Sequence, residues 1–190
     1  NLGSTYFNLR QFSKSLTHLE KALEYNSNNV DAHWNRSITL LAMGRYKEGW
    51  REYEWRWRKS EFQSQKKNYT QPPWDGSIQQ NKTLLIWHEQ GYGDTIQFVR
   101  LVKKAHTKVN KIILAVPAAL KKLLQNTEGV DRVIEQDSVP PDFDIHCPIM
   151  SLPRLLNLSL KNIPNKVPYL SPAKTNSSVV RSVLRDNNSL

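Results

Sequence analysis

The stretch KTLLIWHEQGYGDTIQFVRLVKKAH, residues 82–106, sets the expected architecture. Its opening run, KTLLIWH, is apolar without alternation, as in a parallel strand that is buried on both faces. From Asp94 onward, apolar residues recur at helical spacing, at Ile96, Val99, Val102 and Ala105. Two glycines that flank a tyrosine lie between these segments. The stretch therefore predicts a strand, a loop and a helix in succession, as in parallel sheets.

The same alternation continues toward the C-terminus. We expect further strands over 111–117, 130–136 and 143–148, and helices over 117–129, 149–160 and 175–188. Alternating strands and helices predict a parallel sheet with helices on its faces. Residues 82–190 are therefore expected to form one Rossmann-like unit of an α/β fold. Ligands of such sheets bind beyond the carboxyl ends of the strands. Those ends are expected at 88–94, Pro117, Gln136 and 146–151.

Toward the N-terminus, residues 1–60 contain an internal repeat. Leu9 and Met43 lie 34 positions apart, and so do Phe12 and Tyr46. This period, with small residues where helices approach and aromatic residues between them, resembles the tetratricopeptide repeat, a pair of antiparallel helices. The resemblance covers about two units, the first incomplete. It implies α-helical hairpins that recruit a protein or glycan acceptor as partner.

The second repeat ends in EGWREYEWRWRKSEF, residues 48–62, where aromatic and basic residues are interleaved. Trp50, Tyr53 and Trp57 fall on one helical stripe, which favours a buried face. Arginines between aromatic residues can also stack on nucleic-acid bases. Because the 27 basic residues of the chain are scattered rather than gathered, we expect core packing and no nucleic-acid partner.

Residues 61–81 separate the two parts. They contain two prolines, a Trp-Asp-Gly turn and many polar residues, which predict a linker. Trp74 is expected to fix this linker to one of the two parts.

Composition limits the remaining classes. The 190 residues are 38% hydrophobic and carry a net charge of +10, so a core can form and anionic partners are attracted. No apolar run approaches the ~20 residues of a membrane span, and no signal peptide opens the chain. The single cysteine, Cys147, cannot form an internal disulfide, which fits a cytoplasmic location. Because the chain does not begin with Met, we expect it to be part of a longer protein.

The loop after the first predicted strand, HEQGYGD at 88–94, does not match a known phosphate loop. Gly91 and Gly93 fit the first two glycines of the dinucleotide motif G-x-G-x-x-G, but Ile96 stands at the third. No acidic residue ends the next predicted strand, and no Gly-Lys-Ser or Gly-Lys-Thr follows. The loop therefore argues against a nicotinamide, flavin or P-loop nucleotide site.

Asp94 has two compatible interpretations. It can be the N-cap of the following helix, with Gln97 three residues later as the partner of a capping-box-like pair. It can also be a general base that takes a proton from an acceptor hydroxyl in the ligand crevice. Glu89 and His88 are alternative bases in the same loop. The residue chemistry alone favours the cap.

A resemblance changes this balance. It is carried by LLIWHEQGYGDTIQFVRLV, VPAALKKLLQNTEGVDRVI, PPDFDIHCPIMSLPRLLN and IPNKVPYL. With the repeats before them, these segments resemble bacterial proteins in which tetratricopeptide repeats precede a glycosyltransferase domain similar to the ADP-heptose:lipopolysaccharide heptosyltransferases. The resemblance implies a GT-B fold of two Rossmann-like units, transfer without a metal or cofactor, and a nucleotide-sugar donor held mainly by the C-terminal unit. The catalytic aspartate of the heptosyltransferases falls on Asp94.

The candidate site residues surround Asp94 and the end of the last predicted strand. The candidates for substrate binding are His88, Glu89, Gln90, Gly91, Gly93, His146 and Ser151. His146 and Ser151 can bond acceptor hydroxyls or only stabilise their loop, two interpretations of equal weight. No metal site is expected, because His88, His146 and Cys147 lack the spacing of paired ligands.

Two functions compete. The first is the acceptor half of a glycosyltransferase, inactive alone because the donor unit lies beyond Leu190. The rival is a non-enzymatic scaffold, whose repeats bind partners and whose Rossmann-like unit is a docking surface.

Overall fold

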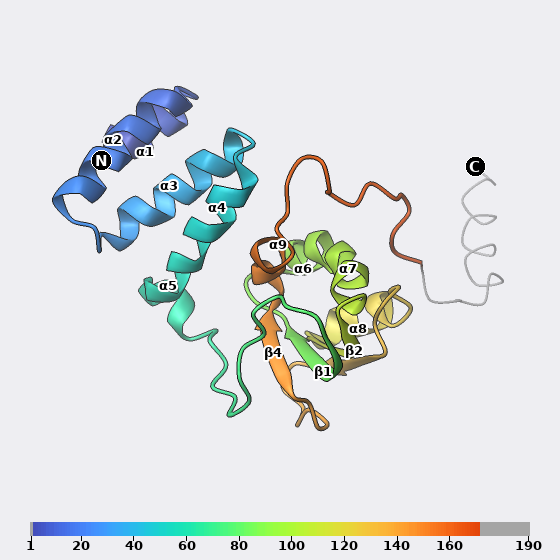
Figure 1. Ribbon diagram of the computed structural model, residues 1–190. Helices are drawn as coiled ribbons and strands as arrows, with labels where there is room; N and C mark the ends of the chain where they lie inside the picture. Colours follow the sequence, from blue (N-terminus) through green and yellow to red (C-terminus); the bar gives the residue numbers. More distant parts are fainter. Residues whose placement is uncertain (1, 172–190) are drawn as a thin grey trace, which may run out of the picture.

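The computed structural model describes residues 2–171 and shows a helical part beside a parallel sheet (Figure 1). The helical part contains α1 (Leu2–Asn8), α2 (Phe12–Tyr25), α3 (Val30–Ala42), α4 (Tyr46–Glu52), the 3-10 helix η1 (Tyr53–Arg58) and α5 (Ser60–Gln63). Consecutive helices from α1 to α4 pack on one another. The buried apolar side chains of α2 and α3 are Leu16, Leu19, Ala32 and Leu40.

The turn between α1 and α2 recurs between α3 and α4. In each turn, three consecutive N–H groups donate to carbonyls of the preceding helix: those of Leu9, Arg10 and Gln11, and those of Met43, Gly44 and Arg45. The acceptors are Thr5, Phe7 and Tyr6 in the first turn and Thr39, Leu41 and Leu40 in the second. The middle residues, Arg10 and Gly44, are both left-handed, with φ of 57° and 75°. The 34-residue sequence period therefore corresponds to a repeated backbone conformation.

The predicted parallel sheet is confirmed. Its strands are β1 (Gln79–Trp87), β2 (Val109–Val116), β3 (Arg132–Glu135) and β4 (Ile145–Pro148). They are all parallel, in the order β3-β2-β1-β4. The chain moves outward from β1 to β3 and then returns to the other side of β1 as β4. The carboxyl ends of β1 and β4 therefore flank the switch point, where open parallel sheets bind ligands.

Helices cover one face of the sheet. They are α6 (Tyr92–Phe98), η2 (Val99–Leu101), α7 (Val102–His106), α8 (Ala118–Leu124), η3 (Ile149–Ser151) and α9 (Leu152–Leu155). Leu84 and Ile86 of β1 lie in the core beneath them, and Trp50 and Tyr53 of the helical part belong to the same core. The expected burial of these two aromatic residues is confirmed, and one continuous core joins the helical part to the sheet.

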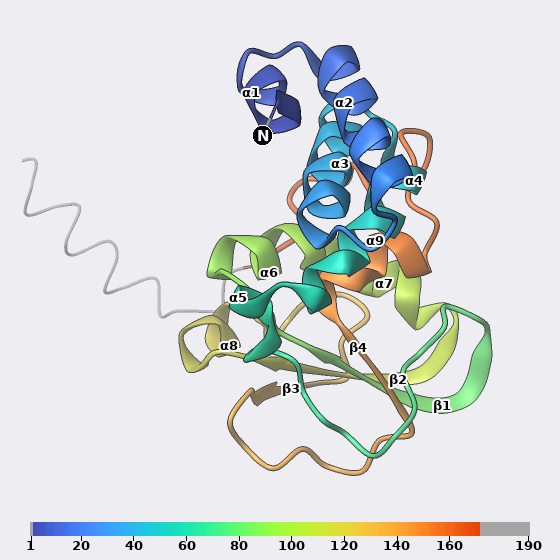
Figure 2. The ribbon, with the colours of Figure 1, turned by 90° about the vertical axis from the view of Figure 1, so that its left-hand side faces the viewer.

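The opposite face of the sheet has a different cover. Its side chains are Leu85, Trp87, Ile113, Ala115 and Ile134, and all are buried. Trp57 of η1 packs on them with Tyr69 and Phe143, which come from two loops. Among residues 2–171, helices thus cover one face, and Trp57 with two loop aromatics covers the other. Figure 2 shows α6, α7 and α9 on one side of the sheet. The helix expected over 175–188 lies outside the described residues.

The predicted linker, 61–81, contains structured elements. β1 begins inside it, at Gln79. The segment Pro72–Trp74, here called the strap, lies along the free edge of β4. The Trp74 N–H donates to the carbonyl of His146 at 2.7 Å, and the His146 N–H donates to that of Pro72 at 3.2 Å. Trp74 is 2% exposed and lies in the core of the sheet. The expectation that Trp74 fixes this segment to one part is confirmed.

Three predicted helices have different limits in the structure. The helix expected over 117–129 is α8, which ends at Leu124. The helix expected over 94–106 begins at Tyr92 and consists of α6, η2 and α7. The helix expected over 149–160 ends with α9 at Leu155. Asn157 follows it with a left-handed φ of 50°, a conformation that ends helices and that asparagine tolerates well.

Candidate functional site

The switch point between β1 and β4 holds an arginine from the helical part. Arg56 of η1 donates from Nε and Nη2 to the two carboxylate oxygens of Glu89, both at 2.8 Å. Its Nη2 also donates to Ser151 Oγ at 2.9 Å, and its Nη1 donates to Glu54 Oε1 at 3.0 Å. Arg56 is 0% exposed and Glu89 is 1% exposed. The two sequence candidates Glu89 and Ser151 therefore bind a side chain of the protein itself.

This buried ion pair is held from several sides. Glu89 Oε1 also accepts from the Met150 N–H at 3.0 Å, and Ser151 Oγ donates to Glu54 Oε1 at 2.8 Å. Burial raises the pKa of Glu89, and the bond to Arg56 only partly offsets that effect. Burial also disfavours the charge on Arg56, but the bonds to Glu89 and Glu54 outweigh it and raise the pKa of Arg56. Each charge is tolerated because its partner is present.

The next residue of the loop, Gln90, is also held by residues of preceding segments. Its backbone N–H donates to Gln65 Oε1 at 2.6 Å. Its side-chain amide exchanges hydrogen bonds with the hydroxyl of Tyr53, at 2.9 and 3.1 Å. Gln90 has a left-handed φ of 62°, which is uncommon for a residue other than glycine. The shape of this loop thus depends on η1 and on the segment after it.

Asp94 caps α6, but not as its N-cap residue. Gly91 is the N-cap, and Asp94 is the third residue of the helix. The Asp94 Oδ2 accepts from the Gly91 N–H at 3.0 Å, as the carboxylate of a capping box does. The expectation that Asp94 is the N-cap and Gln97 its partner is therefore wrong by three positions, because the helix begins earlier than predicted. Asp94 is half-buried.

The other residues near Asp94 differ in accessibility. His88 Nδ1 is hydrogen bonded to Thr95 Oγ1 at 2.6 Å, and burial lowers the pKa of His88, so its ring is neutral at pH 7. Gly91 and Gly93 are exposed. A Cβ built at Gly91 would lie 3.1 Å from Asp94 Oδ2, whereas one built at Gly93 meets nothing within 4 Å. Packing therefore gives no reason for a glycine at position 93.

His146 lies inside β4 rather than after it. Its Nδ1 accepts from the indole N–H of Trp87 at 3.2 Å, so Nε2 is the donor of the neutral ring. Burial lowers the pKa of His146. The rings of Tyr69 and His146 are 5.1 Å apart in an edge-to-face arrangement. The side chain of His146 is thus packed against that of Trp87.

One pocket lies where the helical part, the following segment and the sheet meet. It has a volume of about 150 Å³ and is called the junction pocket here. Its lining includes the sequence candidates His146 and Ser151, but not Asp94 or the rest of loop 88–94. The helical part contributes Glu54 and Trp57, the following segment Lys66 and Lys67, and the sheet unit Trp87 and Arg154. The structure thus brings two of the candidates into a cavity that all three segments build.

Sequence reasoning missed most of the residues that build this region. Arg56 was not singled out, because an arginine between aromatic residues is expected to lie at a surface. Lys66 and Lys67 were part of the predicted linker. The signal that was available was the density of aromatic and basic residues over 48–67, which is unusual for a segment that only joins two domains.

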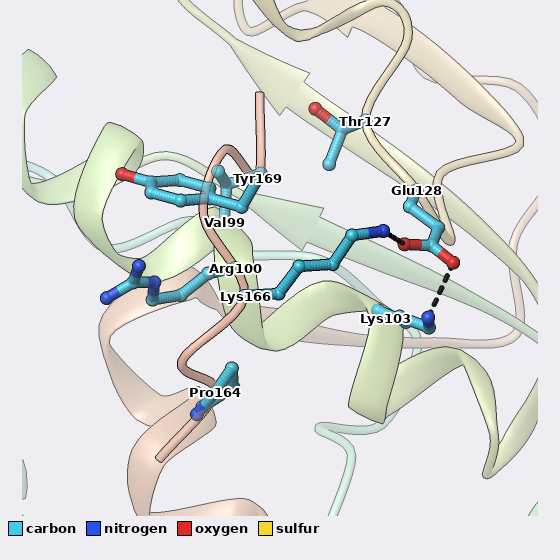
Figure 3. A pocket seen from close by; sticks show the side chains of 8 residues that line it. All are labelled: Val99, Arg100, Lys103, Thr127, Glu128, Pro164, Lys166 and Tyr169. Atoms are coloured by element: carbon cyan, nitrogen blue, oxygen red, sulfur yellow. Dashed lines mark hydrogen bonds and ion pairs between the residues drawn. The ribbon is translucent and has the colours of Figure 1, made fainter. Parts of the chain in front are cut away.

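A second hollow, of about 60 Å³, lies near α7 and is lined by Val99, Arg100, Lys103, Thr127, Glu128, Pro164, Lys166 and Tyr169. Figure 3 shows Lys103 and Lys166 directed at Glu128 from two sides, at 2.6 and 3.3 Å. Arg100 stacks on Tyr169, 4.3 Å from its ring centre. The charges of this hollow are therefore largely engaged with neighbouring groups.

Cys147 is inaccessible in the folded chain. It lies in β4, is 2% exposed, and burial strongly raises the pKa of its thiol. Because the thiolate is the reactive form, we expect a thiol reagent such as DTNB to label the native protein more than about a hundredfold more slowly than the urea-unfolded chain. Labelling at equal rates in both states would show that β4 is exposed in solution.

No helix within residues 2–171 is long and apolar enough to cross a membrane. In the same range, no group of three or more His, Cys, Asp or Glu side chains is arranged to hold a metal ion. No protein-family model, curated protein or solved structure matches the chain.

Proposed function

We propose that the chain is the acceptor-side part of a glycosyltransferase of the GT-B type, with Asp94 as general base and with tetratricopeptide-like hairpins that recruit the acceptor. The four sequence segments that resemble heptosyltransferases support this proposal. The parallel sheet and its switch point are compatible with it. In the complete enzyme, a second Rossmann-like unit would hold the nucleotide sugar.

The observation that carries the proposal is the pair Gly93–Asp94. Asp94 presents a half-buried carboxylate in the loop-to-helix turn at the carboxyl end of β1. The residue before it is an exposed glycine for which packing gives no reason. A glycine leaves room for a ligand to approach the backbone closely. Such a ligand would lie next to the carboxylate.

The reaction then follows from the position of the base. The Asp94 carboxylate takes the proton of an acceptor hydroxyl as its oxygen attacks the anomeric carbon of the donor sugar. The bond from that carbon to the nucleoside diphosphate breaks, and its electron pair leaves with the diphosphate. Attack from the opposite side inverts the anomeric centre.

The test is nucleotide release and sugar transfer by the longer protein that this proposal requires. It is incubated with a panel of nucleotide sugars, together with bacterial envelope saccharides and co-purifying proteins as acceptors. We expect acceptor-dependent release of nucleoside diphosphate with one donor. Release no faster than by the Asp94→Asn variant, for every donor, would reject the proposal.

Replacing Gly93 by alanine separates the packing of this turn from its function. A Cβ at this position meets no atom within 4 Å, so the fold tolerates it. Within a helix, alanine is favoured over glycine by about 0.5–1 kcal/mol. We expect Gly93→Ala to leave the melting temperature unchanged or slightly raised and to slow transfer at least about tenfold, because the methyl group occupies the acceptor's approach. Unchanged transfer would show that the acceptor does not approach Gly93.

A further inference from the structure

The junction pocket carries an excess of positive charge. Lys66, Lys67 and Arg154 line it, against the single carboxylate of Glu54. That carboxylate is already engaged by Arg56 at 3.0 Å, by the hydroxyl of Ser151 at 2.8 Å and by Arg154 at 3.7 Å, which leaves the charges of the two lysines uncompensated. Burial lowers the pKa of His146, so this ring adds no charge at pH 7. A ligand of this pocket therefore meets a positive field.

The two lysines of the pocket are unpaired. Neither Lys66 nor Lys67 forms an ion pair with a residue in the described range 2–171, whereas Lys59, Lys82 and Lys121 each have a carboxylate partner. Lys67 also lies close enough to His88 to lower the pKa of that ring further, after the larger effect of burial. Both lysines line the same pocket, and ammonium groups without a counter-charge attract an anion.

The walls of the pocket are flat and apolar. Trp57 is half-buried and packs on Trp87, which is 2% exposed; their ring centres are 5.7 Å apart and tilted by 49°. Large aromatic faces bind flat apolar surfaces, and the C–H face of a pyranose ring is such a surface. Ser151 also lines the cavity, but its hydroxyl already donates to Glu54 and accepts from Arg56. Cationic and aromatic groups thus line one cavity of about 150 Å³, enough for part of a small polar ligand.

We infer that the junction pocket binds a sugar that carries a phosphate monoester, with Lys66 and Lys67 on the phosphate and Trp57 against the sugar ring. The sugar part of this inference rests on the proposed function, and the phosphate part rests on the unpaired lysines. The residues that select the ligand come mainly from residues 54–67, between the helical repeats and the sheet. The site is composite, and neither part of the chain forms it alone.

The experiment is a binding titration, and its result does not depend on sugar transfer by the protein. The chain is titrated with a panel of hexose monophosphates, with the matching free hexoses and with inorganic phosphate, by calorimetry and by tryptophan fluorescence. We expect at least one hexose monophosphate to bind more tightly than both its free hexose and inorganic phosphate. Lys66→Ala with Lys67→Ala should weaken this binding at least about tenfold, because it removes two charge-assisted contacts.

The matched control is Lys121→Ala with Lys122→Ala. These adjacent lysines lie exposed on α8 and do not line the pocket, so the change in charge is the same. The inference is wrong if no hexose monophosphate binds, or if the control weakens binding as much as the pocket variant does. Equal binding of inorganic phosphate and the hexose monophosphate would leave an anion site and reject the sugar.

The outcome is independent of the transfer assay. If the longer protein transfers sugar but no hexose monophosphate binds, the proposed function stands and the inference about the junction pocket is wrong. If a hexose monophosphate binds but the longer protein transfers no sugar, the pocket is a phosphosugar site and the proposed glycosyltransferase function is wrong.

Discussion

Replacing Arg56 by alanine is expected to destabilise the protein by about 3–5 kcal/mol, because it leaves the carboxylate of Glu89 buried without its partner. Arg56 also donates to Glu54, to Ser151 and to the carbonyl of Tyr53, so three further groups lose a hydrogen-bond partner. For a chain of this size, the midpoint of thermal unfolding should fall on the order of 10 °C. The measurement is urea unfolding followed by circular dichroism, together with a thermal melt.

The chain contains a matched control for this variant. Arg45 binds Glu48 in the same two-pronged way, from Nε at 2.9 Å and from Nη2 at 2.6 Å. This second pair is exposed, with 39% and 49% of the two side chains accessible. Exposed ion pairs contribute at most about 1 kcal/mol. Arg45→Ala should therefore have a small effect, and equal destabilisation by both variants would contradict the role assigned to burial.

A second variant at position 56 tests whether the positive charge alone stabilises Glu89, or whether the planar guanidinium is also needed. Arg56→Lys keeps the positive charge but cannot supply the planar pair of donors that Glu89 binds. We expect it to recover only part of the stability lost in Arg56→Ala. Full recovery would mean that charge alone matters at this position.

Replacing Asp94 by asparagine is expected to slow sugar transfer by about 10²–10⁴-fold in the complete enzyme, which is the usual contribution of a general base. Asparagine is the informative choice because of the cap. Its side-chain oxygen can still accept from the Gly91 N–H, as Asp94 Oδ2 does at 3.0 Å. The variant thus keeps the helix start and removes the basic carboxylate. The rate of transfer and the melting temperature are both measured.

The control for Asp94→Asn is Asp94→Ala, which removes both the base and the cap. We expect the two variants to be equally slow, but only the alanine variant to lose about 1 kcal/mol of stability. If the asparagine variant transfers at the normal rate while the alanine variant is less stable, Asp94 is only a cap. The proposed role of Asp94 as base would then be wrong.

The strands were predictable because their residues are almost all apolar. KTLLIWH and KIILAVP have no alternation, and both became central strands buried on both faces. The order of the strands was not predictable in the same way, because no local pattern states which side of β1 receives β4. The exact ends of the helices were not predictable either, because no local residue marks them. Nothing in the residues from Thr95 to His106 marks the 3-10 turn at Val99–Leu101 that divides the expected helix.

The composition of the site was less predictable than the fold. Glu89 looked like a free acid beside a glycine-containing loop, and Ser151 looked like a hydroxyl near a strand end. Their partner, Arg56, lies 33 residues before Glu89 and 95 before Ser151, so only the tertiary structure brings them together. A local sequence pattern identifies polar residues near the ends of strands. It does not show which of them are already bound within the fold.

The strap has a consequence for how this chain can be divided. An open sheet edge presents unpaired N–H and C=O groups that can pair with another molecule and start aggregation. Pro72–Trp74 bonds to His146 along the edge of β4, and its two prolines have no N–H to offer beyond it. A shorter chain that began at β1 would lose this protection and expose a β4 edge suited to intermolecular pairing. The polar, proline-containing segment between the repeats and the sheet therefore also covers the edge of the sheet, and a cut placed there would uncover that edge.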